Sequence, residues 1–191
     1  MELVCETNKY AFVVLKPDAI RQFLDINIIQ EIPKEGLEII KHKMIKMTQE
    51  QVATVYAEKL NENYYPFLEK FLTEEPSICL LLKSEADAIK KSQELKDKIR
   101  ADFKIKKFEI SKKDLELLKD SRHPQQEEIT REMALENLIH AANNFKEVCE
   151  NIRKIFTETE IEELRKREPQ LYHLFLEYRR ELERRKEIMI K

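Results

Sequence analysis

The sequence contains a single glycine, Gly36, among its 191 residues. At an ordinary usage of about 7%, a chain of this length would contain about 13 glycines. One glycine cannot make the glycine-rich loops that bind phosphate in many nucleotide-binding proteins, such as G-x-G-x-x-G or G-x-x-x-x-G-K-[ST]. If this protein binds nucleotides, it must therefore hold them with side chains and helix ends.

Other features are also scarce, and each shortage excludes a class of protein. Lys and Arg number 35 against 37 Asp and Glu, and the net charge of −2 argues against nucleic acid as a partner. No apolar run approaches the roughly 20 residues of a membrane span, and the N-terminus lacks the pattern of a signal peptide. The three cysteines, Cys5, Cys79 and Cys149, are odd in number and contain no C-x-x-C. Reduced thiols in a cytoplasmic protein are expected.

The spacing of apolar residues predicts an alternation of strands and helices. Strands are expected over 10–15, 37–47, 76–82 and 137–140, and helices over 20–32, 48–60, 64–72, 84–99 and 145–155. Asp18 is expected to cap the first helix, Thr48 to form a capping box with Gln51, and Asn143 or Asn144 to cap the last. Split β-α-β units in this order predict an α+β, ferredoxin-like fold, a four-stranded antiparallel sheet covered by helices.

His140 is the candidate nucleophile. It lies at the end of a predicted strand, immediately before a predicted helix whose free N–H groups and dipole suit a phosphate. A neutral imidazole there could attack a phosphoryl group and become phosphohistidine, although a histidine that only packs or caps is the commoner case. Five other polar or aromatic residues add weight as a set, and each taken alone has an ordinary structural explanation. They are Lys16, Tyr56, Tyr64, Arg100 and Asn137.

Four segments together resemble the nucleoside diphosphate kinase family. Ala-Phe-Val-Val-Leu-Lys-Pro-Asp at 11–18 is similar to that family's first strand, and Tyr-Tyr-Pro-Phe-Leu-Glu-Lys-Phe at 64–71 to its aromatic helix. Ile-Arg-Ala-Asp-Phe at 99–103 resembles its Ile-Arg-Gly-Asp-Phe, and Asn-Leu-Ile-His-Ala-Ala-Asn-Asn at 137–144 its phosphohistidine segment. The matching stretches cover most of residues 8–103 and 137–164, and their joint occurrence is specific.

The resemblance implies a ping-pong phosphotransferase. His140 would take the γ-phosphoryl group of a nucleoside triphosphate, ATP among others, and pass it to a nucleoside diphosphate. Mg²⁺ would arrive on the nucleotide phosphates, so no metal site formed by the protein is expected. The resemblance also implies a homo-oligomer, a hexamer or a tetramer built on dimers.

It also implies roles for the other five residues. Lys16 would contact the phosphates and the ribose 3′-hydroxyl, and Asn137 the same hydroxyl. Arg100 would neutralise phosphate charge. Tyr64 would stack on the base, and Tyr56 would stand beside the histidine and steady it.

The sequence departs from the family where a loop binds phosphate. Ser92 aligns with a phosphate-binding arginine, and the threonine and the loop after it are deleted. A nearby lysine could supply charge instead, without the bidentate geometry of an arginine. The candidates are Lys90, Lys91, Lys96 and Lys98.

A second group of departures lies around the histidine. Asn151 takes the position of the glutamate that orients the imidazole in the family, and Glu150 is next to it. Ala141 and Ala142 replace the Gly-Ser that follows the family's histidine, which removes a hydroxyl group.

Two segments fall outside the resemblance. The charge-dense insertion 104–136 is either a solvated helical excursion or a source of cations over the site, from Lys104, Lys106, Lys107, Lys112, Lys113, Arg122 and Arg131. We expect a domain over 1–164 that includes this insertion, and a helical extension over 165–191. The extension's stripe of Leu171, Phe175, Tyr178 and Leu182 needs a cover, either the domain or another subunit.

The sequence thus leaves two main hypotheses. The first is a divergent nucleoside diphosphate kinase, and the second is a catalytically weakened nucleotide-binding or assembly module on the same fold. A nucleic-acid binder that uses the basic tail is the weakest alternative because of the net charge.

Overall fold

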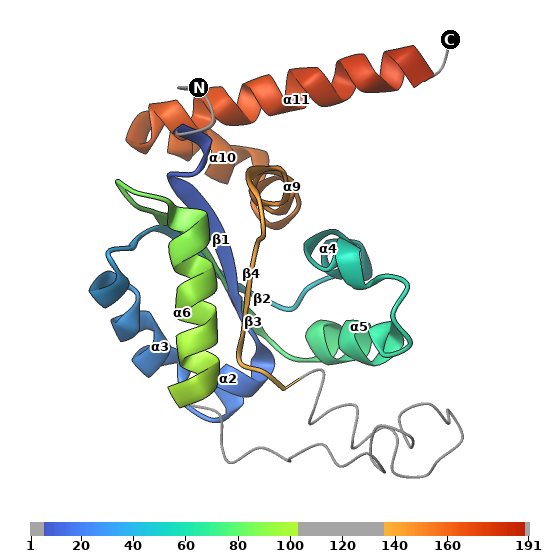
Figure 1. Cartoon of the computed structure of the whole chain (residues 1–191). Helices are drawn as coiled ribbons and strands as arrows, with labels where there is room; N and C mark the ends of the chain where they lie inside the picture. The colour runs from blue at the N-terminus through green and yellow to red at the C-terminus, as the bar shows by residue number, and fades with distance from the viewer. Residues whose placement is uncertain (1–5, 103–135, 190–191) are drawn as a thin grey trace.

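The structure, a computed structural model, describes residues 6–102 and 136–189 (Figure 1). Its four strands are β1 (Tyr10–Leu15), β2 (Glu38–Ile45), β3 (Ser77–Lys83) and β4 (Ile139–Ala141). They form one sheet in the order β2-β3-β1-β4, and each neighbouring pair is antiparallel. The predicted ferredoxin-like sheet is confirmed, with β1 and β3 at its centre.

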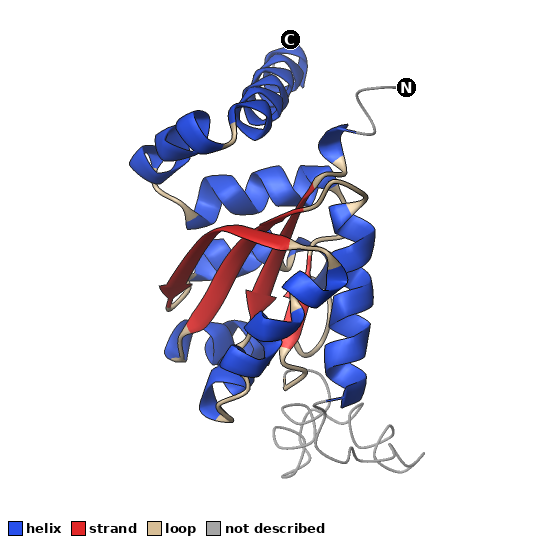
Figure 2. Ribbon diagram, turned by 90° about the vertical axis from the view of Figure 1, so that its left-hand side faces the viewer, coloured by secondary structure: helices blue, strands red, loops and turns tan. Residues whose placement is uncertain are grey.

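Helices lie on both sides of this sheet (Figure 2). The α-helices are α2 (Pro17–Arg21), α3 (Asp25–Glu31), α4 (Gln49–Val55), α5 (Tyr65–Glu74), α6 (Ala88–Asp102), α9 (Phe145–Ile155), α10 (Glu158–Arg167) and α11 (Pro169–Met189). Two short 3₁₀ helices, η1 (Pro33–Glu35) and η2 (Ala57–Lys59), complete the described elements. Since successive side chains of a strand point to opposite faces, β1 contributes to two separate cores.

The two cores explain why β1 is apolar along its whole length. Tyr10, Phe12 and Val14 pack into a cluster with α4, α5, α9, α10 and α11. Ala11, Val13 and Leu15 pack on the other face with α3 and α6. All six residues of β1 are buried, so the strand forms a rigid centre to which flanking functional groups can be fixed.

The single helix predicted over 20–32 is two helices in the structure. Phe23 adopts a left-handed conformation with φ of 58°, and its N–H donates to Ile20 O while that of Leu24 donates to Ala19 O. This is the Schellman arrangement that ends a helix, normally with glycine at the left-handed position. Apolar spacing continues through the break, because Ile28 and Ile32 remain buried.

Two predictions near the fourth strand are wrong in detail. Asp18 does not cap the first helix, whose N-cap is Lys16; the Asp18 carboxylate instead accepts a hydrogen bond from Leu138 N. The strand begins at Ile139 rather than at Asn137, because Leu138 has a φ of 64° and cannot continue a sheet. The capping box of Thr48 with Gln51 is confirmed, and Asn144 is the N-cap of α9.

The first part of α11 is covered by the domain itself. Leu171, Leu174 and Phe175 are buried in the same cluster as Tyr10 and Phe12. Two lysines of β2 also bind α10, since Lys41 pairs with Glu163 (3.0 Å) and Lys43 with Glu160 (2.7 Å), and Tyr10 Oη donates to Glu168 Oε2 (3.3 Å). Residues 157–178 are therefore fixed to the sheet by apolar and polar contacts.

Candidate functional site

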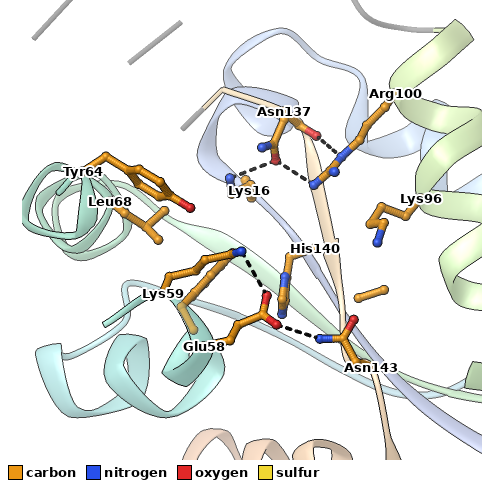
Figure 3. Close-up of a pocket in the computed structure, with 12 residues that line it drawn as sticks. Lys16, Glu58, Lys59, Tyr64, Leu68, Lys96, Arg100, Asn137, His140 and Asn143 are labelled. Atoms are coloured by element: carbon orange, nitrogen blue, oxygen red, sulfur yellow. Dashed lines mark hydrogen bonds and ion pairs between the residues drawn. The ribbon is translucent and has the colours of Figure 1, made fainter. Parts of the chain in front are cut away.

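A pocket of about 320 Å³ opens at the β4 edge of the sheet (Figure 3). One wall comes from α6 on one face, and the opposite wall comes from η2 and the start of α5 on the other. Its lining residues are Lys16, Tyr56, Glu58, Lys59, Tyr64, Leu68, Lys96, Arg100, Asn137, His140, Ala141 and Asn143. All six residues predicted for the site are among them, so the fold brings together groups that are far apart in the sequence.

His140 lies in the middle of β4, where pairing with β1 fixes its direction. It stands opposite Val14, and directly opposed residues of an antiparallel pair point to the same face. The imidazole is 9% exposed, and its Nε2 has no hydrogen-bond partner within residues 6–102 and 136–189. The pKa of His140 is lowered to about 3, first by burial and then by nearby cations. These cations are Lys16, Lys96, Arg100 and Lys59. The imidazole is therefore neutral at physiological pH, as a nucleophile must be.

Asn137 joins the two predicted cations of the site. Lys16 Nζ donates to Asn137 Oδ1 over 2.9 Å, and Arg100 Nη2 donates to the same oxygen over 3.0 Å. Arg100 also donates to Ile139 O over 2.8 Å, which ties α6 to β4. Lys16 is 2% exposed, and burial lowers the pKa of its ammonium group to about 8. Both cations are held next to the strand that carries His140.

The two tyrosines occupy different parts of the pocket. The Tyr56 ring lies 4.5 Å from the His140 ring, centroid to centroid, with Lys16 Nζ 5.9 Å from its centroid. Tyr56 is buried, and burial raises the pKa of its hydroxyl well above the usual range. Tyr64 is the N-cap residue of α5 and lies with Leu68 on the side of the pocket opposite α6 (Figure 3). Its aromatic face and the Leu68 side chain can contact a planar ligand.

Sequence reasoning missed three charged or polar pocket residues, Glu58, Lys59 and Asn143. Glu58 Oε2 accepts a hydrogen bond from Asn143 Nδ2 over 3.1 Å, and Glu58 Oε1 lies 3.5 Å from Lys59 Nζ. Lys59 follows Tyr56 by three residues, one turn of a 3₁₀ helix, and this spacing is the signal that could have identified it. The pocket thus has four cationic side chains and one carboxylate among its lining residues.

The four lysines suggested as substitutes for the family's arginine separate in the structure. Lys96 lines the pocket, four residues before Arg100 on the same face of α6. The others lie elsewhere: Lys90 pairs with Glu94, Lys91 donates to Gly36 O, and Lys98 pairs with Glu31 and Glu35. The cationic residues of the insertion between 104 and 131 fall outside the described residues.

Ser92 and Asn151, two positions where the sequence departs from the family, are both buried. Ser92 is fully buried, and its hydroxyl donates to Ile89 O over 2.8 Å, within its own helix. Asn151 is 1% exposed, and neither atom of its amide has a hydrogen-bond partner in the described part of the chain. Glu150 accepts a hydrogen bond from Tyr178 Oη over 2.7 Å. The Ser92 hydroxyl thus donates its hydrogen bond within α6 and not toward the pocket.

No helix in the described ranges is both long and apolar enough to cross a membrane. Within the same ranges, no group of three or more His, Cys, Asp or Glu side chains is arranged to hold a metal ion.

Comparisons with known proteins agree on one family. The family model described as "Nucleoside diphosphate kinase" matches residues 9–161. A nucleoside diphosphate kinase of Histophilus somni is 36% identical over 79 residues, which are 41% of this chain and 56% of that protein. Another, of Kosmotoga olearia, is 38% identical over 72 residues, 38% of this chain and 49% of that protein. The chain therefore spans about half the length of the curated relatives it matches.

Solved structures show the same fold. A nucleoside-diphosphate kinase from Borrelia burgdorferi, with bound vanadate and ADP as a transition-state mimic, has a TM-score of 0.61 at 19% identity, over 79% of this chain and 88% of that one. A halophilic one from Halobacterium salinarum in complex with CDP has a TM-score of 0.55 at 19% identity, over 80% and 90% of the two chains.

Proposed function

The chain belongs to the nucleoside diphosphate kinase family, and we propose that it transfers the γ-phosphoryl group of a nucleoside triphosphate to a nucleoside diphosphate through phosphorylated His140. One observation carries the proposal: His140 is a buried, neutral imidazole in a pocket lined by Lys16, Lys59, Lys96 and Arg100. A neutral imidazole can attack phosphorus, and the cations favour the charge that develops on the phosphate oxygens.

In the first half-reaction, a ring nitrogen of His140 forms a bond to the γ-phosphorus. The bond between that phosphorus and the bridging oxygen breaks, and the nucleoside diphosphate leaves with the bonding electrons. In the second half-reaction, a terminal oxygen of another nucleoside diphosphate attacks the phosphorus on His140. The N–P bond breaks, and the neutral imidazole is restored, so the enzyme returns to its starting state.

The remaining predicted residues position the nucleotide. Lys16 and Arg100 face the phosphates, with Asn137 holding both cations and contacting the ribose 3′-hydroxyl. Tyr64 stacks on the base, which gives tolerance of different bases because every base has a flat aromatic face. Tyr56 packs against His140 and limits the movement of its ring.

Further parts of the proposal concern the wider context. Mg²⁺ enters as part of the nucleotide substrate, bound to its phosphates. We assign residues 1–164, including the insertion 104–136, to the phosphotransferase domain and residues 165–191 to a helical extension. The active form is a homo-oligomer in the cytoplasm.

The test is direct labelling. Incubation of the full chain with γ-labelled ATP should give an acid-labile, alkali-stable label that a nucleoside diphosphate removes. His140→Ala should lose the label, whereas His173→Ala, a change at an exposed histidine of α11, should retain it. Absence of label on the parent protein, or its survival in His140→Ala, would refute the proposal.

A non-catalytic nucleotide-binding or assembly module is the second candidate. It is favoured by Ser92, whose hydroxyl is bonded within α6 at the position where the family has a phosphate-binding arginine. This alternative predicts nucleotide binding without label on His140, so the same experiment, with a binding measurement, separates the two.

A further inference from the structure

Lys59 and Lys96 approach His140 from the two walls of the pocket (Figure 3). We infer that these two lysines bind the phosphate groups of the nucleotide and supply the positive charge that the deleted phosphate loop no longer provides. The inference rests on the proposed function for the identity of the ligand. It extends that function to residues outside the segments that resemble the family's active site.

Lys96 is held close to the histidine strand by Gln93. The Lys96 ammonium group contacts Gln93 Oε1, and Gln93 Nε2 donates to Ala141 O and Ala142 O, both over 3.0 Å. These carbonyls belong to the two residues that follow His140. Because Gln93, Lys96 and Arg100 lie on one face of α6, the helix presents two cations to the same pocket. Burial, with a further effect of Arg100, lowers the pKa of Lys96, and the carboxylates of Asp97 and Glu58 oppose this shift only in part.

Lys59 comes from the other wall, at the end of η2. Its Nζ lies 3.5 Å from Glu58 Oε1, while the other oxygen of that carboxylate is bonded to Asn143. An ion pair of this length at a pocket mouth contributes little, since the Lys59 side chain is 37% exposed. Lys59 can therefore exchange this contact for a phosphate without a large loss.

The other two cations of the pocket are more firmly engaged. Arg100 makes three hydrogen bonds, to Asn137 O, Asn137 Oδ1 and Ile139 O, and these bonds hold α6 against β4. Lys16 is bonded to Asn137 Oδ1. A triphosphate needs several donors around its oxygens, so Lys59 and Lys96 are the cations best placed to add to Lys16 and Arg100.

The experiment measures binding by the full chain with the phosphates as the only variable. Titration calorimetry compares ATP with adenosine, which has the base and ribose without phosphates, for Lys59→Gln, Lys96→Gln and the double variant. Lys90→Gln is the matched control, because Lys90 lies on the same helix but outside the pocket, beside Glu94. Lys96→Gln should weaken ATP binding by about tenfold, the scale of one charge-assisted hydrogen bond. Lys59→Gln should weaken it by a few-fold, and adenosine affinity should not change.

The outcomes separate this inference from the proposed function. Loss of ATP affinity in the lysine variants, with unchanged adenosine affinity, supports the inference even if His140 is never labelled. If His140 is labelled and the Lys59 and Lys96 variants bind ATP as tightly as Lys90→Gln does, the inference is wrong. The proposed phosphoryl transfer is then still supported. A parent protein that binds no ATP overturns both.

Discussion

The backbone N–H of Leu138 donates a hydrogen bond to Asp18 Oδ2 over 2.8 Å, across 120 residues of sequence. Leu138 O in turn accepts a hydrogen bond from Lys16 N over 2.8 Å. These two bonds hold Leu138 in its left-handed conformation, two residues before His140. The turn that leaves β1 therefore fixes the start of the strand that carries the candidate nucleophile.

Asp18→Ala is expected to destabilise the protein by about 1 to 3 kcal/mol, because it leaves the buried N–H of Leu138 without a partner. Asp18→Asn keeps an oxygen acceptor at this position and should cost less. Urea denaturation measures both free energies of unfolding. Equal losses for the two variants would show that the hydrogen bond to Leu138 is not the cause.

The acid dependence of stability should report the buried His140. The pKa of its imidazole is lowered to about 3 in the folded state, whereas an unfolded histidine takes up a proton near pH 6.5. Between these values the unfolded chain binds more protons, so stability should fall as the pH falls from about 6.5 toward about 3.

His140→Asn, which has no such titration, should lose less stability over that window. Proton NMR of the parent protein should show His140 ring signals that do not shift between about pH 8 and pH 5. A midpoint near the value of free histidine would contradict the buried, neutral imidazole.

The lowered pKa of Lys16 predicts that ATP affinity depends on pH in the alkaline range. Burial lowers the pKa of its ammonium group to about 8, so above this pH the free protein has lost the charge that we propose faces the phosphates. ATP affinity should therefore decrease as the pH rises through about 8. Lys16→Arg should bind ATP less well, because its geometry differs, but without this decrease, since arginine keeps its charge. A decrease that persists in Lys16→Arg would assign the effect to another group.

Phe175→Ala tests whether α11 belongs to the core. Phe175 is 2% exposed and packs in the cluster that contains Tyr10 and Phe12. Its truncation should cost about 3 to 5 kcal/mol, the usual range for a buried phenylalanine. Arg180→Ala, at an exposed position of the same helix, should change stability by less than about 0.5 kcal/mol. Comparable effects of the two changes would mean that α11 is not anchored through Phe175.

The two central strands, β1 and β3, were predictable because they are short apolar runs bounded by clear breaks. Pro17 ends the first of these runs, and Gly36, with a φ of 67°, adopts a left-handed conformation shortly before β2. The break at Phe23 was not predictable, since a phenylalanine in the left-handed position gives no signal in the sequence. A chain with one glycine must use other residues at such positions, as it does at Phe23 and Leu138.

The pocket residues that match a family motif could be predicted from the sequence. Those whose position depends only on how the helices pack could not. Lys96 was one of four equivalent lysines in the sequence. Of these four, it alone lies on the face of α6 that lines the pocket. Gln93 gave no signal in the sequence, and only the spacing of Lys59 from Tyr56 could have pointed to Lys59. Their roles depend on residues of η2, α6 and β4 meeting at one sheet edge, which local sequence cannot show.

The clustering of cations around His140 has a consequence for the protein without its ligand. Beyond the effect of burial, Arg100 lowers the pKa values of Lys16 and Lys96, and all of these cations disfavour protonation of His140. The part of each shift that comes from a neighbouring cation reflects repulsion, which Asp18 offsets at Lys16 and Asp97 offsets in part at Lys96. A neutral residue at Lys96 would then make the free protein harder to melt and a poorer binder of ATP, so thermal stability and ligand affinity oppose one another at this pocket.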